Sequence, residues 1–160
     1  MIKEYFQDFM PENVCFGCGA SNKDGLQIKS YWEDDISVCI WTPEEKYHGW
    51  ANLLNGGIIA TLIDCHCMGT AMADAYKREN RFLNSEPIYR YATGTLNIKY
   101  LKPTSNNYPV VIKAKVTEVK GKKTVLTCDL YSQDIKTVEA QVIAIRVYDS
   151  SLENSENPFK

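Results

Sequence analysis

One stretch of the sequence constrains the fold more than any other: residues 58–78 contain no proline and no strand-like alternation. Alanine, leucine and methionine are prominent in it, which predicts one helix of about five or six turns. The residues expected to pack are not confined to one side of this helix; they are Ile59, Leu62, Ile63, Cys67, Thr70 and Met72. Such a distribution indicates a helix that other structure surrounds.

The rest of the chain supplies strands that can surround this helix. Residues 26–42 alternate between apolar and polar on both sides of Glu33-Asp34-Asp35, which predicts a first hairpin. After the helix, the β-rich segments are 92–101, 110–120, 123–133 and 137–148. Gly121 occupies the turn between the second and third of these segments. The order predicts an α+β fold, in which a curved antiparallel β-sheet surrounds one long central α-helix.

The 160 residues fit one domain with one core. Turn-forming residues crowd 1–25, so we expect an N-terminal lead-in loop there, a folded domain over 26–150 and a polar C-terminal tail over 151–160. Because an open sheet has exposed edges, we expect a homo-oligomer, with a homodimer and a homotetramer both satisfying the argument.

Charge and composition exclude several classes of partner. The net charge is −2 and basic residues are dispersed, so we expect no nucleic-acid partner. Acidic residues interrupt the N-terminus, and no apolar run approaches the roughly 18 to 20 residues that span a bilayer, so we expect no signal peptide and no membrane partner. A cytoplasmic location follows, where the six cysteines would be free thiols.

The start of the predicted helix carries the residues best suited to chemistry. Gly56 and Gly57 open it, and their backbone N–H groups with the helix dipole suit a developing oxyanion. Asp64 lies two turns inside on a stripe of small or apolar residues, namely Gly57, Ala60, Thr61, Met68 and Ala71. Burial there would raise its pKa and make it a stronger base or nucleophile. The alternative is a structural carboxylate that caps a loop or pairs with Lys99 or Arg90.

The cysteines raise the question of a metal. Cys15 and Cys18 have CxxC spacing, and a Cys65-His66-Cys67 run lies in the helix, so zinc is an alternative use of these side chains. Adjacent helix positions point in different directions, so at most two of the three could bind one ion. Because the spacing falls short of a paired CxxC arrangement, we expect no metal and no cofactor.

Three motifs follow one another along the chain: residues 15–19 with Gly25-Leu26, residues 47–64 with Met68-Gly69, and residues 93–103. Together they resemble the hotdog-fold thioesterase superfamily, in its phenylacetate-degradation and THEM-like branch. The resemblance covers most of the chain and implies a hotdog fold and hydrolysis of an acyl-CoA thioester to free acid and CoA. It also implies a site that two subunits build together.

The resemblance assigns roles to individual residues. Asp64 matches the acidic residue that acts as general base or nucleophile, and Gly56 matches the glycine whose N–H polarises the thioester carbonyl. Thr93 matches a strand hydroxyl that positions water or substrate. Asn55 stands where the family usually has histidine, and His48 where it usually has glutamine. Both can still form hydrogen bonds, so the resemblance implies positioning roles for them.

The remaining substrate contacts are expected around the helix start. Gly57 would let substrate approach the backbone closely, and Lys102 could contact the phosphates of CoA, although a solvated strand face is the alternative. The replacements at Asn55 and His48 also motivate a second function, a non-catalytic module that binds acyl or aromatic ligands. A hotdog dehydratase is a third, because a fold does not fix chemistry.

Overall fold

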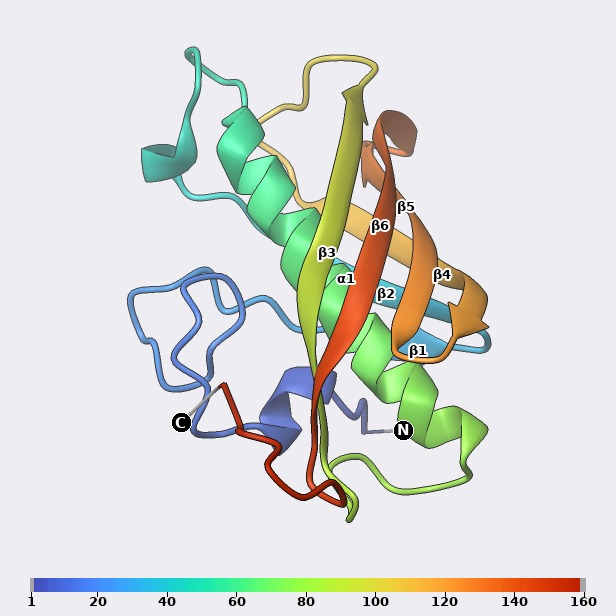
Figure 1. Ribbon diagram of the computed structural model, residues 1–160. Helices are drawn as coiled ribbons and strands as arrows, with labels where there is room; N and C mark the ends of the chain where they lie inside the picture. Colours follow the sequence, from blue (N-terminus) through green and yellow to red (C-terminus); the bar gives the residue numbers. More distant parts are fainter. Residues whose placement is uncertain (1, 159–160) are drawn as a thin grey trace.

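One long helix lies across the face of a single curved sheet in the computed structural model, which describes residues 2–158 (Figure 1). The elements are the 3-10 helix η1 (Phe6–Phe9), β1 (Tyr31–Glu33), β2 (Ile36–Trp41), the 3-10 helix η2 (Glu45–Tyr47), α1 (Gly56–Arg78), β3 (Tyr89–Tyr100), β4 (Val110–Lys120), β5 (Lys123–Ser132) and β6 (Ile135–Asp149). The strand order is β1-β2-β4-β5-β6-β3 and every pair is antiparallel. The predicted α+β hotdog arrangement is confirmed.

The core forms between α1 and the inner face of the sheet. Alternate residues of β4, β5 and β6 are buried there, and they are Val110, Ile112, Ala114, Leu126, Cys128, Leu130, Val138, Val142 and Ala144. On the helix side, Leu62 and Ile63 are fully buried. Burying a side chain of this size stabilises the fold by about 1.5–3 kcal/mol. The period of two along the strands and the apolar circumference of α1 therefore account for the architecture.

His66 is a polar residue inside this core. Its Nδ1 lies 2.8 Å from Ser30 Oγ and its Nε2 lies 3.1 Å from Ser37 Oγ, while Ser37 Oγ also lies 2.6 Å from Thr70 Oγ1. Burial lowers the pKa of His66 to about 4, so the ring is neutral at pH 7. The serine hydroxyls thus satisfy both ring nitrogens of an imidazole that is buried in the protein core.

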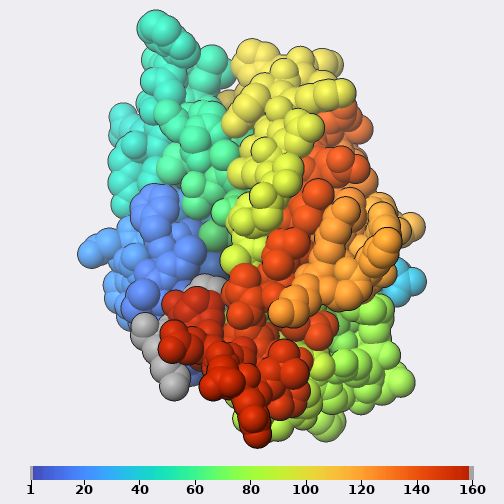
Figure 2. Space-filling view, viewed as in Figure 1, coloured from blue at the N-terminus to red at the C-terminus, as the bar shows by residue number. Residues whose placement is uncertain are grey.

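The first hairpin is shorter than the sequence predicts, because β1 begins at Tyr31 and not near residue 26. The backbone N–H groups of Leu26 and Ile28 donate to the carbonyls of Phe16 and Gly17, at 2.9 and 3.0 Å. The N–H groups of Leu26 and Ile28 therefore bond to the lead-in and not to a neighbouring strand, and Trp41 of β2 reaches this segment only through its side chain, which donates to the Leu26 carbonyl at 2.9 Å. Figure 2 shows the lead-in (blue) against the flank of the molecule, beside the helix and the loop that precedes it.

Helix α1 also departs from one expectation. By length and composition, this helix is long and apolar enough to cross a bilayer, whereas the sequence predicts no such run. Charged residues are few along most of its length. In this structure most of its apolar stretch is buried inside the protein, as expected for the core helix of a sheet-wrapped domain.

Strand β3 contains a bulge. The register of β3 against β6 shifts between Thr93 and Thr95, so that Gly94 comes close to β6. A Cβ atom at Gly94 would lie 2.9 Å from Cγ1 of Ile145, which only glycine avoids. Bulges bend a strand and redirect its side chains. The bulge lies next to Thr93, which lines the candidate site.

Candidate active site

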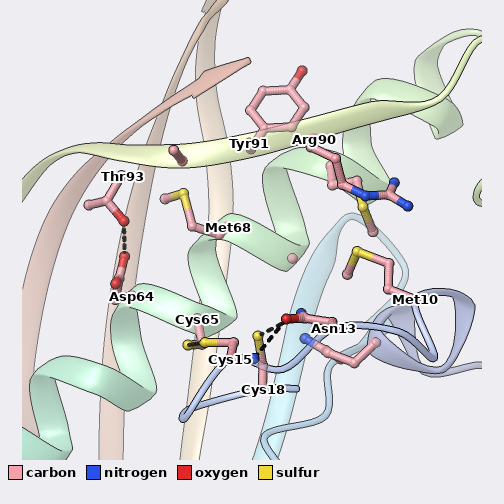
Figure 3. Close-up of a pocket in the computed structure, with 14 residues that line it drawn as sticks. Met10, Asn13, Cys15, Cys18, Asp64, Cys65, Met68, Arg90, Tyr91 and Thr93 are labelled. Carbon is pink, nitrogen blue, oxygen red and sulfur yellow. Dashed lines mark hydrogen bonds between the residues drawn. The ribbon is translucent and has the colours of Figure 1, made fainter. Parts of the chain in front are cut away.

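A cavity of about 220 Å³ opens between the lead-in, helix α1 and strand β3. Its wall is mostly apolar and includes Met10 from the lead-in, Met68 from α1 and Tyr91 from β3 (Figure 3). Met72 of α1 also lines it. Asp64 and Thr93 lie on this wall as polar groups. The lead-in, α1 and β3 are far apart in the sequence, but all three contribute to the wall around the Asp64 carboxylate.

Thr93 holds the Asp64 carboxylate across the gap between α1 and β3. Its Oγ1 donates a hydrogen bond to Oδ1 of Asp64 (Figure 3), and no residue within 2–158 hydrogen-bonds the other carboxylate oxygen. Burial raises the pKa of Asp64, the Thr93 hydrogen bond lowers it, and negative charge at Cys15 raises it. The net effect raises the pKa of Asp64, as predicted from its position on an apolar stripe of the helix.

The alternative in which Asp64 pairs with Lys99 or Arg90 is wrong. Lys99 Nζ lies 4.0 Å from Oε1 of Glu139, and Arg90 Nη2 lies 3.5 Å from Oε1 of Glu12. Neither cation reaches Asp64. Within residues 2–158, no basic side chain pairs with this carboxylate.

Asn55 caps the start of α1. Its Oδ1 accepts hydrogen bonds from the N–H groups of Gly57 and Ile58, at 2.8 and 3.2 Å. The Gly57 N–H is therefore engaged inside the chain, which corrects the expectation that it is a free donor for substrate. The N–H of Gly56 has no acceptor among the described residues, and its carbonyl accepts from Tyr100 Oη at 2.7 Å.

The other two predicted contacts lie at this end of the helix. Lys102 is exposed and lines a surface hollow with Asn55, Gly56 and Tyr100. His48 is half-buried and forms a backbone bridge with Leu54, which shapes the loop before α1. His48 is not among the residues that line either hollow.

The predicted site residues therefore form two groups. Asp64 and Thr93 share the apolar cavity, while Asn55, Gly56 and Lys102 lie at the helix start. Gly56 precedes Asp64 by eight residues, which corresponds to about 12 Å along a helix axis. Within one chain, the two groups are therefore separated along the helix.

Some residues of these groups have no role predicted from the sequence. Tyr100 belongs to the 93–103 motif, but nothing in the sequence signals that its hydroxyl would reach the Gly56 carbonyl. Nothing in the sequence indicates that Met10 lines the cavity, because its position depends on how the lead-in folds back over α1. Cys15 and Cys18 line the same cavity as Asp64, together with Cys65. Their CxxC spacing is the signal that could have brought them into the site.

All six cysteines are free thiols, as predicted. Cys15 Sγ accepts hydrogen bonds from the thiols of Cys18 and Cys65, and these lower the pKa of Cys15. The pKa values of Cys18 and Cys65 are raised in turn.

Known proteins resemble this chain in sequence. A model of the thioesterase superfamily matches residues 51–139. Acyl-coenzyme A thioesterase THEM4 of Rattus norvegicus is 32% identical over 108 residues, which are 68% of this chain and 41% of that protein. The Bos taurus THEM4 is 27% identical over 113 residues, 71% of this chain and 41% of that protein. The chain thus spans about two-fifths of the length of these relatives.

Solved structures resemble it in fold. A thioesterase superfamily protein from Shewanella loihica PV-4 has a TM-score of 0.61 and 25% identity, over 79% of this chain and 96% of that one. The E. coli PaaI protein, from the phenylacetic acid degradation operon, has a TM-score of 0.63 and 13% identity, over 78% and 82%. The second shows the shared fold alone. With the helix, the curved sheet and the sequence match over residues 51–139 in agreement, the chain belongs to the thioesterase superfamily.

Proposed function

We propose that this protein hydrolyses an acyl-CoA thioester to a free acid and CoA. The observation that carries the proposal is the half-buried Asp64 carboxylate, which Thr93 holds at the wall of an apolar cavity. Such a cavity suits an acyl chain, and its few polar groups would orient the reacting carbon. The names of the THEM4 relatives, which are acyl-coenzyme A thioesterases, support the choice of substrate.

In the proposed reaction, Asp64 removes a proton from water as the water oxygen adds to the thioester carbonyl carbon. The carbonyl electron pair moves onto oxygen, where a backbone N–H stabilises the negative charge. Collapse of this intermediate breaks the carbon–sulfur bond, and the departing thiolate of CoA takes the proton back from Asp64. Direct attack by Asp64 on the carbonyl carbon, followed by hydrolysis of the anhydride, is the other route open to the same carboxylate.

The backbone donor comes from a second subunit in this proposal. Gly56 and Asp64 of one chain are about 12 Å apart along α1, whereas both must approach one carbonyl. Thr93, Asn55 and Gly56 are exposed in the single chain. A homodimer in which Gly56 of the partner subunit reaches Asp64 would complete two equivalent sites.

The hollow at the helix start is the proposed place for CoA. Lys102 is exposed beside Gly56, where its ammonium would contact a CoA phosphate. Asn55 fixes the first turn of α1 and so orients the Gly56 N–H. His48 supports the loop through its backbone bridge with Leu54.

The test follows free thiol release from short, long and aromatic acyl-CoAs by the purified protein and by Asp64→Asn. We expect turnover to fall by about 10²- to 10⁴-fold, because loss of a general base costs this much. The matched control is Asp74→Asn, the same change on the same helix, where the carboxylate pairs with Arg78 outside the cavity. The control should keep wild-type turnover.

Normal turnover in Asp64→Asn would exclude the mechanism. If the wild-type protein binds acyl-CoA but releases no thiol from any member of the panel, the non-catalytic binding module replaces the enzyme.

A further inference from the structure

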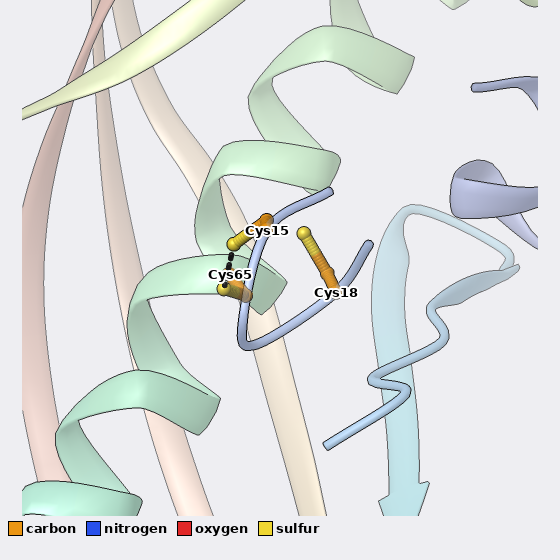
Figure 4. A group of neighbouring side chains, drawn as sticks. All are labelled: Cys15, Cys18 and Cys65. Atoms are coloured by element: carbon orange, nitrogen blue, oxygen red, sulfur yellow. Dashed lines mark hydrogen bonds between the residues drawn. The ribbon is translucent and has the colours of Figure 1, made fainter. Parts of the chain in front are cut away.

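Three cysteine sulfurs meet where the lead-in touches helix α1 (Figure 4). The Sγ atoms of Cys15, Cys18 and Cys65 all lie within 4.8 Å of one another. Cys15 Sγ and Cys65 Sγ are 3.8 Å apart, although these residues are separated by 50 positions. Two sulfurs bound at about 2.3 Å to a tetrahedral zinc ion are themselves about 3.8 Å apart. The spacing of the cluster therefore fits a shared metal ion.

The lead-in loop is built to bring these sulfurs together. The backbone N–H groups of Gly17 and Cys18 face the Cys15 sulfur, and the Gly19 N–H donates to the Cys15 carbonyl at 2.8 Å. Asn13 contributes a further donor, since its Nδ2 lies 3.7 Å from Cys18 Sγ. Donors aimed at sulfur stabilise thiolates, which are the form that binds a metal.

Gly17 lets the loop lie directly on the helix cysteine. A Cβ atom at position 17 would lie 2.3 Å from Cys65 Sγ, a distance that no side chain could occupy. The close approach of the loop to Cys65 therefore depends on glycine at this position. Backbone donors and glycine contact together form a preorganised sulfur site that would otherwise have no evident use.

The neighbouring charges favour a cation at the cluster. The wall of the cavity that holds the three cysteines also holds Asp64, and its one basic residue, Arg90, pairs with Glu12. The Cys15 thiolate and the Asp64 carboxylate thus share a small volume in which the one basic side chain, Arg90, is engaged by Glu12 and by the Tyr89 carbonyl. Zinc prefers sulfur ligands in tetrahedral geometry, so it matches both the charge and the ligand type.

We propose that Cys15, Cys18 and Cys65 bind one zinc ion, which fastens the lead-in to helix α1. The fourth position of the ion faces the cavity and is filled by water or another small ligand, since all three cysteines line that cavity. This replaces the expectation that the chain has no metal site. The two other members of the Cys65-His66-Cys67 run are used elsewhere, because His66 bonds Ser30 and Ser37 while Cys67 contacts Cys128.

The experiment measures the number of zinc ions per chain by elemental mass spectrometry. The protein is produced with added zinc and purified with reductant and without chelator. We expect about one zinc per chain in the wild type and less than about a tenth in Cys65→Ser and in the double variant Cys15→Ser/Cys18→Ser. Cys128→Ala is the control and should keep the ion, because Cys128 is a buried residue of β5 whose thiol contacts Cys67 and not the cluster. Circular dichroism verifies that each variant is folded.

Cobalt substitution gives a second readout that needs no thioester. A tetrahedral thiolate site shows a sulfur-to-cobalt charge-transfer band and intense visible bands, which should vanish in Cys65→Ser and persist in Cys128→Ala. A wild-type protein that holds no zinc, with all six thiols reactive after unfolding, would overturn the proposal. So would a disulfide within the cluster, or full zinc content in folded Cys65→Ser. None of these measurements depends on thioesterase activity.

Discussion

A single hydrogen bond sets the position of the Asp64 carboxylate. Thr93 donates to Oδ1 from the bulged part of β3, and the rest of the carboxylate faces an apolar wall. Thr93→Val keeps the shape but removes the donor, and a hydrogen bond to a charged group is worth about 1.5–3 kcal/mol. We therefore expect kcat for thioester hydrolysis to fall by about 10- to 100-fold.

Thr93→Ser separates positioning by the hydroxyl from packing by the methyl group. It retains the hydroxyl, so it should restore most of the lost kcat in steady-state assays. Equal kcat in Thr93→Val and the wild type would show that the hydrogen bond does not position the base.

His66 couples the stability of the core to pH. Its pKa is lowered to about 4 in the folded protein from an ordinary value of 6.5, so the unfolded chain binds more protons between these values. The free energy of unfolding therefore falls as pH decreases through this window. For this residue alone we expect a loss of about 2 kcal/mol between pH 7 and pH 5, measured by urea unfolding.

The His66→Gln variant tests whether this loss belongs to the imidazole. Glutamine can hydrogen-bond Ser30 or Ser37 but does not titrate. Between pH 7 and pH 5, the free energy of unfolding of the variant should therefore fall by about 2 kcal/mol less than that of the wild type. Identical pH dependence in the two proteins would assign the loss to other groups.

The stability of helix α1 depends on the cap at its N-terminus. Asn55 accepts from two N–H groups of the first turn, which would otherwise lack partners in the chain. We expect Asn55→Ala to lower the free energy of unfolding by about 1 kcal/mol in urea titrations. Asn55→Asp preserves the cap and should unfold near the wild-type midpoint. An unchanged midpoint in Asn55→Ala would show that water replaces the cap without cost.

The elements whose signals are local could be predicted from the sequence. Gly121 has a φ of 58°, as its hairpin turn requires, and β4 and β5 begin at the predicted residues. The helix register also placed Asp64 on a stripe with Met68, which shares its cavity. Residues 26–28 alternate like a strand yet bond to the lead-in, because the pattern does not specify the bonding partner.

The rest of the candidate site depends on contacts between distant parts of the chain. Cys15 reaches Cys65 only because the lead-in folds back over α1, and no local pattern encodes that approach. The engagement of Gly57 by Asn55 was likewise hidden, since the sequence alone does not show which N–H groups a cap takes. Candidate residue types could be predicted, whereas their pairing could not.

For the whole molecule, the two edges of the sheet are unequal. At one edge β1 has 3 residues, and at the other β3 has 12 residues, most of them exposed beyond Ala92. A long unprotected edge is a template for pairing with another strand. Pairing of β3 with a second copy would cover Thr93 and bring two candidate sites close to the two-fold axis.

A complementation experiment decides whether the site is shared between subunits. Gly56→Pro removes the proposed donor N–H at the first helical position, where proline is well accepted. Asn55 before it is extended, with φ −61° and ψ 134°, and a Cβ at position 56 would lie 3.6 Å from the Tyr100 ring, an ordinary contact. We expect Gly56→Pro and Asp64→Asn each to be folded and nearly inactive alone.

In the proposed homodimer, co-expression of the two variants would give mixed dimers in about half of the assemblies. If the Gly56 N–H and the Asp64 carboxylate of one site come from different chains, each mixed dimer carries both defects in one site and none in the other. Thiol release should then recover to roughly a quarter of the wild-type rate, since half of the dimers have one of two sites intact. If both groups acted within one chain, every site of a mixed dimer would lack one of them and activity would stay at the level of the separate variants. Because about 12 Å along α1 separates the two groups within one chain, we expect the recovery.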